Sequence, residues 1–186
     1  MPESNSKKPY IAAVSGSMRE TSSNTRVLLA ATSLLQGAYD IRLSDHIQTL
    51  PPFNPDSDHD HSQAPLPVKQ WRQFIAEASA VMICTPEYAA GIPGSLKNAL
   101  DWLVSSGEFV NKPTAAISAS PGQGGGSIAL ASLAGTLRIM TATLPDNCTH
   151  SIAFVSKKLT ATGVDPETET ELQQLATNLS KLTTTA

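Results

Sequence analysis

The chain has 186 residues, of which 40% are hydrophobic and 16% are charged, so it can bury a sizeable core. The formal net charge is −3 and the pI is about 5.8, which argues against a general nucleic-acid binder, because such proteins need a basic face. No apolar run approaches the ~20 residues that a membrane-spanning helix needs, so we expect no membrane span.

Short apolar runs and runs with helical spacing alternate along the whole chain. In chain order they predict a strand (10–14), a helix (24–36), a weaker strand (39–43), a long Pro-, Asp- and His-rich loop (50–66), a helix (68–78), a strand (80–84), a helix (95–104), a strand (114–119), a helix (128–140), a strand (151–155) and a helix (166–182). Parallel strands need such crossover helices, and the apolar strands imply helices on both faces of the sheet. The sequence therefore predicts one doubly wound α/β domain, 1–186, with five parallel strands in the flavodoxin-like order 2-1-3-4-5.

The two ends of the chain and its two cysteines bear on where the protein works. Residues 1–8 and 183–186 are expected to be flexible tails. The first ten residues carry charge without an apolar segment behind them, so we expect no secretory signal and a cytoplasmic protein. Cys84 and Cys148 are too few for a disulfide framework, and Cys84 lies in an apolar run, which favours a small buried side chain.

Three segments rich in small polar residues follow predicted strands: 15–25, 85–91 and 118–127. In the expected strand order, the strands that precede them lie side by side. Ligands of open parallel sheets bind beyond the carboxyl ends of the strands, near the point where the strand order reverses. We therefore expect the three loops to form one continuous site.

The first loop, VSGSMRETSSNT, suits a phosphate. Hydroxyls, Arg19 and backbone amides at a helix N-terminus together bind a phosphate dianion. The loop has neither the Walker pattern nor a G-x-G-x-x-G turn. The alternative is an ordinary helix cap by Ser23 or Asn24, although a cap needs only one or two such residues.

The other two loops suit a flat ring. The second, TPEYAAGIPG, offers Tyr88 and several backbone amides, although its prolines and glycines also fit a simple strand-to-helix turn. The third, SASPGQGGG, allows a close approach of the backbone because glycine has no Cβ, and its alternative is a flexible turn.

Together and in this order, the three loops resemble those of the NADPH-dependent FMN reductase family. The family's approximate G-S-x-R-x-x-S-x-N is matched by Gly16, Ser17, Arg19, Ser22 and Asn24. Its longer P-E-Y-N-x-x-x-P-G-x-L-K-N-x-x-D-W is matched by Pro86, Glu87, Tyr88, Pro93, Gly94, Leu96, Lys97, Asn98, Asp101 and Trp102. The third loop is Ser- and Gly-rich, as in the family, and the similarity spans about residues 10–155. One position departs from the pattern, because Ala89 stands where the family often has Asn.

The resemblance implies a bound FMN and a site built from all three loops. Its phosphate would lie against residues of the first loop, namely Ser17, Arg19, Ser22, Ser23, Asn24 and Thr25. The isoalloxazine ring would lie between the second loop and the third, at Pro86, Glu87, Tyr88, Ala89, Gly91, Ser118, Gln123 and Gly124.

The resemblance also implies an NAD(P)H-dependent oxidoreductase, in which NADPH or NADH passes a hydride to flavin N5. The acceptor would be a small electrophile: a quinone, free flavin, azo or nitro compound, or metal oxyanion. No catalytic side chain is expected, since the flavin carries the chemistry. The family is typically dimeric or tetrameric, with the helix after the second loop at the interface. Two alternatives remain open here: a non-enzymatic FMN electron carrier, and a regulatory module that keeps the fold.

Other combinations of residues in the sequence do not indicate a further functional site. The run Asp58-His59-Asp60-His61 is interpreted as a solvated polar loop rather than a metal site, since no second ligand group follows at helical spacing. There is no G-x-S-x-G elbow for serine hydrolase chemistry. Lys97 and Asp101 have the i, i+4 spacing of an intrahelical ion pair, and Trp102 is expected in the core or an interface.

Overall fold

The computed structural model describes residues 8–184, so the expected tail 1–8, apart from Lys8, and residues 185 and 186 of the C-terminal tail lie outside the described residues. The strands are β1 (Tyr10–Ser15), β2 (Asp40–Leu43), β3 (Ala80–Thr85), β4 (Thr114–Ala119) and β5 (Thr149–Ile152). The α-helices are α1 (Ser23–Ser33), α2 (Leu66–Ala76), α3 (Gly94–Asp101), α4 (Ser127–Ile139), α5 (Val155–Lys158) and α6 (Pro166–Thr184). Four short 3-10 turns complete them: His46–Gln48, Pro55–Ser57, His61–Gln63 and Asp146–Cys148.

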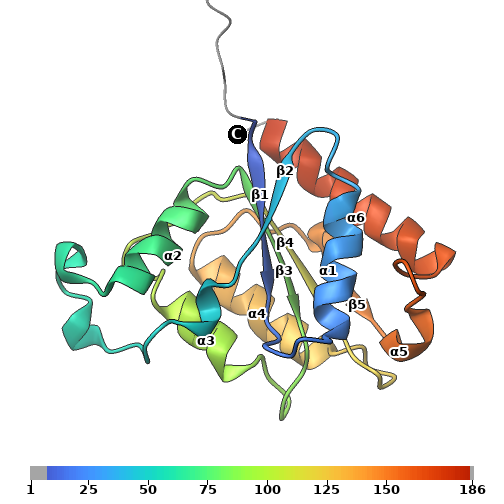
Figure 1. Cartoon of the computed structure of the whole chain (residues 1–186), viewed down its shortest axis with the longest axis horizontal. Coiled ribbons are helices and arrows are strands. Elements are labelled where there is room, and N and C mark those ends of the chain that lie inside the picture. Colours follow the sequence, from blue (N-terminus) through green and yellow to red (C-terminus); the bar gives the residue numbers. More distant parts are fainter. Residues whose placement is uncertain (1–7, 185–186) are drawn as a thin grey trace, which may run out of the picture.

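The five strands form one parallel sheet in the order β2-β1-β3-β4-β5, which confirms the predicted fold class. Figure 1 shows α1 and α6 on one side of the sheet and α2, α3 and α4 on the other. The three central strands, β1, β3 and β4, are buried along their whole length because helices cover both faces. The edge strand β2 stays partly exposed.

The prediction was wrong at the end of the sheet. The last strand was expected over 151–155, but β5 ends at Ile152 and Val155 begins the short helix α5. Phe154 between them has a φ of 53°, a left-handed conformation that breaks the strand. The N–H of Val155 then donates to the carbonyl of Ser120 at 3.0 Å, which brings the start of α5 against the loop after β4.

The long loop 50–66 is fastened to α3 at its beginning. Asn98 donates to the carbonyl of Pro51 at 3.0 Å and accepts from the N–H of Phe53 at 2.7 Å. The indole N–H of Trp102 donates to the same Pro51 carbonyl at 2.9 Å, and the Phe53 ring meets the Trp102 ring edge-on. Two residues of the long second-loop pattern therefore hold a neighbouring segment in place.

A second anchor lies further along the same loop. Asp58 is buried and forms an ion pair with the buried Arg72 of α2, and it also accepts a hydrogen bond from the hydroxyl of Ser105. The interpretation of this carboxylate as solvated was wrong, because two partners distant in sequence enclose it. Burial alone would raise the pKa of Asp58, but the hydrogen bonds from Ser105 and Arg72 outweigh burial and hold the pKa below its ordinary value.

Two smaller predictions are confirmed on and beside α3. Lys97 pairs with Asp101 at 2.5 Å on the outer face of the helix, and Trp102 is fully buried. Across residues 8–184 there is no helix long and apolar enough to cross a membrane, and no group of three metal-ligating side chains is found there either.

Candidate functional site

The loops after β1, β3 and β4 meet at one end of the sheet and enclose a cavity of about 130 Å³. Its lining includes Ser17, Arg19, Ser22, Ser23, Asn24, Pro86, Glu87 and Tyr88 of the predicted set, together with Ala119, Ser120, Pro121 and Val155. Six other predicted residues, namely Thr25, Ala89, Gly91, Ser118, Gln123 and Gly124, lie in the same three segments but do not line this cavity. The topology thus brings together segments that are about seventy and thirty residues apart in the chain.

The first loop lies close against β3 because it contains Gly16. The N–H of Gly16 donates to the carbonyl of Cys84 at 2.8 Å. A Cβ at Gly16 would stand 2.9 Å from the side chains of both Leu96 and Thr85, too close for any other residue without a shift. This glycine therefore fixes how the polar residues after it approach the sheet.

Helix α1 starts directly after this loop, and its N-terminus is only partly capped. Ser22 is the N-cap, and its Oγ accepts from the N–H of Thr25 at 3.3 Å, so the cap is neither Ser23 nor Asn24 as the alternative interpretation had it. Within residues 8–184, the backbone N–H groups of Ser23 and Asn24 have no hydrogen-bond acceptor. Such N–H groups, with the positive end of the helix dipole, attract an anion.

The side chain of Asn24 has a structural task. It is buried, its amide donates to the carbonyl of Ala119 at 3.2 Å, and its Oδ1 accepts from the thiol of Cys84 at 3.3 Å. It thereby ties the start of α1 to the ends of β3 and β4. Burial raises the pKa of the Cys84 thiol well above its ordinary value, so Cys84 is a neutral donor here and no thiolate nucleophile.

The second loop closes in a tight turn at its tip. Tyr88 and Gly91 exchange backbone hydrogen bonds of 2.9 and 3.0 Å, and the two residues between them, Ala89 and Ala90, have φ values of 48° and 59°. Two successive positive φ angles define a type I′ turn, a conformation that Asn and Gly adopt more easily than Ala. Ala89 is exposed at this tip, and Gly91 sets the end of the turn.

The side chain of Glu87 crosses from the second loop to helix α4. Its Oε2 accepts from the N–H groups of Ile128 and Ala129, each at 3.0 Å. The carboxylate thus fills the N-terminus of α4 and holds the second loop against the third. Glu87 would contact a ligand through its backbone and the methylene groups of its side chain, because its carboxylate is already hydrogen-bonded to α4.

The side chain of Ser118, in β4, holds the third loop in its conformation. This buried hydroxyl donates to the carbonyl of Gly125 at 2.9 Å and lies 3.0 Å from the hydroxyl of Ser151. Gly125 and Gly126 have φ values of 61° and 82°, and a Cβ at Gly125 would meet the backbone N of Ala153 at 2.9 Å. The loop can only take this path because both positions are glycine.

Sequence reasoning missed four residues of the lining. Ala119, Ser120 and Pro121 belong to the third loop, and the polar SASPG run was the signal that could have pointed to them. Val155 was missed because it was placed inside the last strand. Gln123 and Gly124 are exposed beyond the cavity.

These residues fit a nucleotide-like cofactor such as FMN. The open N–H groups of Ser23 and Asn24, the hydroxyls of Ser17 and Ser22, and the guanidinium of Arg19 form a donor set for a phosphate dianion. A planar ring beside them would find the backbone of residues 86–88 on one side and that of 119–121 on the other.

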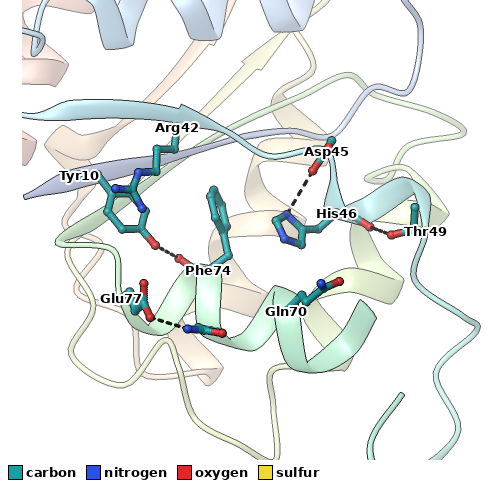
Figure 2. Close-up of a pocket in the computed structure, with 9 residues that line it drawn as sticks. Tyr10, Arg42, Asp45, His46, Thr49, Gln70, Phe74 and Glu77 are labelled. Carbon is teal, nitrogen blue, oxygen red and sulfur yellow. Dashed lines mark hydrogen bonds and ion pairs between the residues drawn. The ribbon is translucent and has the colours of Figure 1, made fainter. Parts of the chain in front are cut away.

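A larger cavity, of about 510 Å³, lies elsewhere, between β2, the turn after it and α2 (Figure 2). The Tyr10 hydroxyl donates to the carbonyl of Phe74 at 2.6 Å, Arg42 covers the Tyr10 ring, and the His46 and Phe74 rings are 4.9 Å apart. None of the three polar loops lines it. The candidate site is therefore chosen by the convergence of the three polar loops and not by the size of the cavity.

The fold and the cavity define a class: a flavodoxin-like α/β protein in which the loops after β1, β3 and β4 meet around one cavity at the N-terminus of α1. Residues 9–156 match the family model described as NADPH-dependent FMN reductase, and the chain belongs to this family. The family's description names NADPH and FMN, and enzymes of this kind use FMN and NAD(P)H.

Several similar proteins are named as reductases. A 2-hydroxy-1,4-benzoquinone reductase of Burkholderia sp. is 34% identical over 168 residues, which cover 88% of this chain and 90% of that protein. An NADPH:quinone oxidoreductase of Arabidopsis thaliana is 39% identical over 125 residues, and the match covers 64% of this chain and 63% of that protein, less than two thirds of its length. Among solved structures, FerB, a flavoenzyme NAD(P)H:(acceptor) oxidoreductase of Paracoccus denitrificans, has a TM-score of 0.84 at 28% identity and covers 95% of this chain and 98% of its own.

Proposed function

We propose that the protein is an FMN-dependent NAD(P)H oxidoreductase that reduces a small electrophilic acceptor of the quinone class. The observation that carries the proposal is the open N-terminus of α1, with Arg19 beside it, in a cavity that the second and third loops also line. The family match and the quinone reductases among the similar proteins support the same activity. Free flavin, azo and nitro compounds and metal oxyanions are other acceptors of the same chemical kind.

Bound FMN would supply the capacity to accept a hydride from a nicotinamide and to pass electrons on. This chain's residues would do the rest by holding and shaping. The first loop would fix the phosphate with Ser17, Arg19 and Ser22 and with the N–H groups of Ser23 and Asn24. Backbone N–H groups of the second and third loops would stabilise negative charge on the ring. No side chain has to serve as acid or base in this proposal.

The oligomeric state and the compartment are also part of the proposal. We infer a homodimer or homotetramer whose interface includes α3, because the family is typically dimeric or tetrameric and Val104, just after that helix, is an exposed apolar side chain. Two free, buried cysteines favour a reducing compartment such as the cytoplasm. Light scattering and cell fractionation test these two points.

The activity is tested by an absorbance spectrum of the purified protein, followed by NADPH addition without oxygen. Flavin bands that bleach within seconds, and that return when a benzoquinone is added, are the expected result. Bands that persist with both NADPH and NADH would instead support an electron carrier. If no flavin band is present and added FMN does not bind, the proposal is wrong.

A further inference from the structure

A second cavity adjoins the cofactor site and shares two of its residues, Ser17 and Arg19. It has a volume of about 310 Å³ and lies between the first loop and the segment that follows β2. Its lining consists of Ser15, Ser17, Met18, Arg19, Glu20, Thr25, Leu43, Ser44, Ile47 and Gln48. We call it the β2 cavity. None of the ring-facing residues 86–88 or 119–121 belongs to it.

The β2 cavity has apolar walls that are open to solvent. Met18 is 53% exposed and Leu43 is 46% exposed, and both line the cavity, while Ile47 forms a buried apolar part of its wall. Large apolar side chains exposed around a concave surface mark a place where a flat apolar group can bind. A heteroaromatic base between Met18 and Leu43 would remove both side chains from water.

The polar groups of the β2 cavity complement a phosphorylated sugar. In the part of the chain that the structure describes, no acidic side chain pairs with the guanidinium of Arg19 and no cation pairs with Glu20. Arg19 can therefore bind a phosphate, and the Glu20 carboxylate can accept a hydrogen bond from the free 3′-hydroxyl of the adenosine ribose, which both NADH and NADPH carry. The side chains of Ser44 and Gln48 add further donors and acceptors on the opposite wall.

We propose that the β2 cavity binds the adenosine diphosphate half of the nicotinamide dinucleotide. The inference rests on the proposed function and deepens it, because it assigns the part of the hydride donor that lies away from the ring. Arg19 stands between the two cavities and meets phosphate on both sides, that of the cofactor and that of the donor. Met18 and Leu43 enclose the adenine, and Glu20 holds the ribose.

The test measures binding of ADP to the FMN-loaded protein by calorimetry, in the wild type and in Leu43→Glu. A carboxylate placed beside a phosphorylated ligand is expected to raise the Kd of ADP, and the KM for NADPH and NADH, by about tenfold or more. ADP should also compete with NADPH in steady-state kinetics. Met18→Glu places the same charge on the part of the lining that the first loop contributes and should reproduce both changes.

Two controls separate this inference from loss of folding and from failure of the proposed function. Leu29→Glu alters a leucine of matched exposure, 44%, on α1 and outside both cavities, and should leave the Kd of ADP unchanged. The donor 1-benzyl-1,4-dihydronicotinamide has no ADP half, so it should bleach the flavin of Leu43→Glu and of the wild type at the same rate.

The inference is overturned if ADP does not bind, if it binds without competing with NADPH, or if Leu43→Glu and Met18→Glu leave the Kd of ADP and the KM unchanged. If the benzyl donor fails to reduce the flavin of the wild type, the proposed function fails, whatever ADP does.

Discussion

The N-termini of α1 and α4 lie beside the same cavity, yet they are completed in different ways. At α4, the carboxylate of Glu87 accepts from two backbone N–H groups, so the chain supplies its own anion. At α1, Ser22 satisfies one N–H group, and those of Ser23 and Asn24 stay without a partner within 8–184. The difference teaches which helix is left for a phosphate: a helix N-terminus is an anion site only where no side chain has already filled it.

The largest change in FMN affinity is expected when an acidic side chain is placed at the N-terminus of α1, as Glu87 is at that of α4. Ser23→Asp places a carboxylate at the first turn of α1, where it would repel the cofactor phosphate and raise the Kd of FMN by about 100-fold or more. The folded chain itself should be stabilised slightly, by about 0.3–1 kcal/mol, because an acid suits a helix N-terminus. Flavin fluorescence titration measures the first effect and urea unfolding the second.

Ser33→Asp is the matched control for that variant, since it adds the same charge at the last residue of α1, far from the loops. Its Kd for FMN should equal that of the wild type. Equal FMN affinity of Ser23→Asp and Ser33→Asp would show that the phosphate does not bind at α1.

The reverse change removes the carboxylate from the N-terminus of α4. Glu87→Ala leaves the N–H groups of Ile128 and Ala129 without their acceptor and should cost about 1–3 kcal/mol of unfolding free energy. Inorganic phosphate should then raise the melting temperature of the variant more than that of the wild type, because a second anion site has appeared. Glu87→Gln keeps one acceptor oxygen and should lose less. A phosphate response no larger than that of the wild type would contradict this account of α4.

A smaller change in FMN affinity is expected when only the positive charge beside the N-terminus of α1 is removed. Arg19→Gln keeps a hydrogen-bond donor but loses the charge, so the Kd of FMN should rise by about tenfold, the weight of one charge-assisted bond. The salt dependence of FMN binding should weaken in parallel. Arg26→Gln, on the side of α1 that bonds to the Thr160 carbonyl, is the control and should change neither quantity.

The smallest effect concerns the turn at the tip of the second loop. Ala89→Asn, the residue common in the family, suits the positive φ better and should stabilise the fold by about 0.5–1 kcal/mol, visible as a higher urea midpoint. FMN affinity should change little, since Ala89 does not line the cavity. A lower urea midpoint would show that the left-handed turn is not retained.

The sequence predicted the sheet well because alternating apolar strands and helices admit few topologies. It also predicted the three loops, because the carboxyl ends of adjacent parallel strands must meet. It did not predict which polar groups would be used up internally. The partners of Glu87 are 41 and 42 residues away, and Asn24 bonds to a carbonyl 95 residues away, so neither pairing has a local signal.

The absence of a local sequence signal for long-range contacts also explains why the predictions for Asp58 and Val155 were wrong. A carboxylate in a Pro-rich polar run predicts a solvated loop, and only the folded chain brings Arg72 and Ser105 around it. Val155 continues an apolar run, and the left-handed Phe154 that ends β5 is imposed by tertiary contacts rather than by local preference.

The anchoring of the 50–66 loop has a consequence for protein engineering. Asn98 and Trp102 hold it by main-chain groups of Pro51 and Phe53. Side chains of the loop add three further contacts: the Phe53 ring against Trp102, Asp58 with Arg72 and Ser105, and His61 with Ser105. The exposed stretch 55–57 lies between these anchors, and within residues 8–184 its side chains form no hydrogen bond or ion pair to the rest of the fold. It is therefore the part of the loop into which a foreign sequence of equal length could be grafted while the scaffold and the candidate site keep their shape.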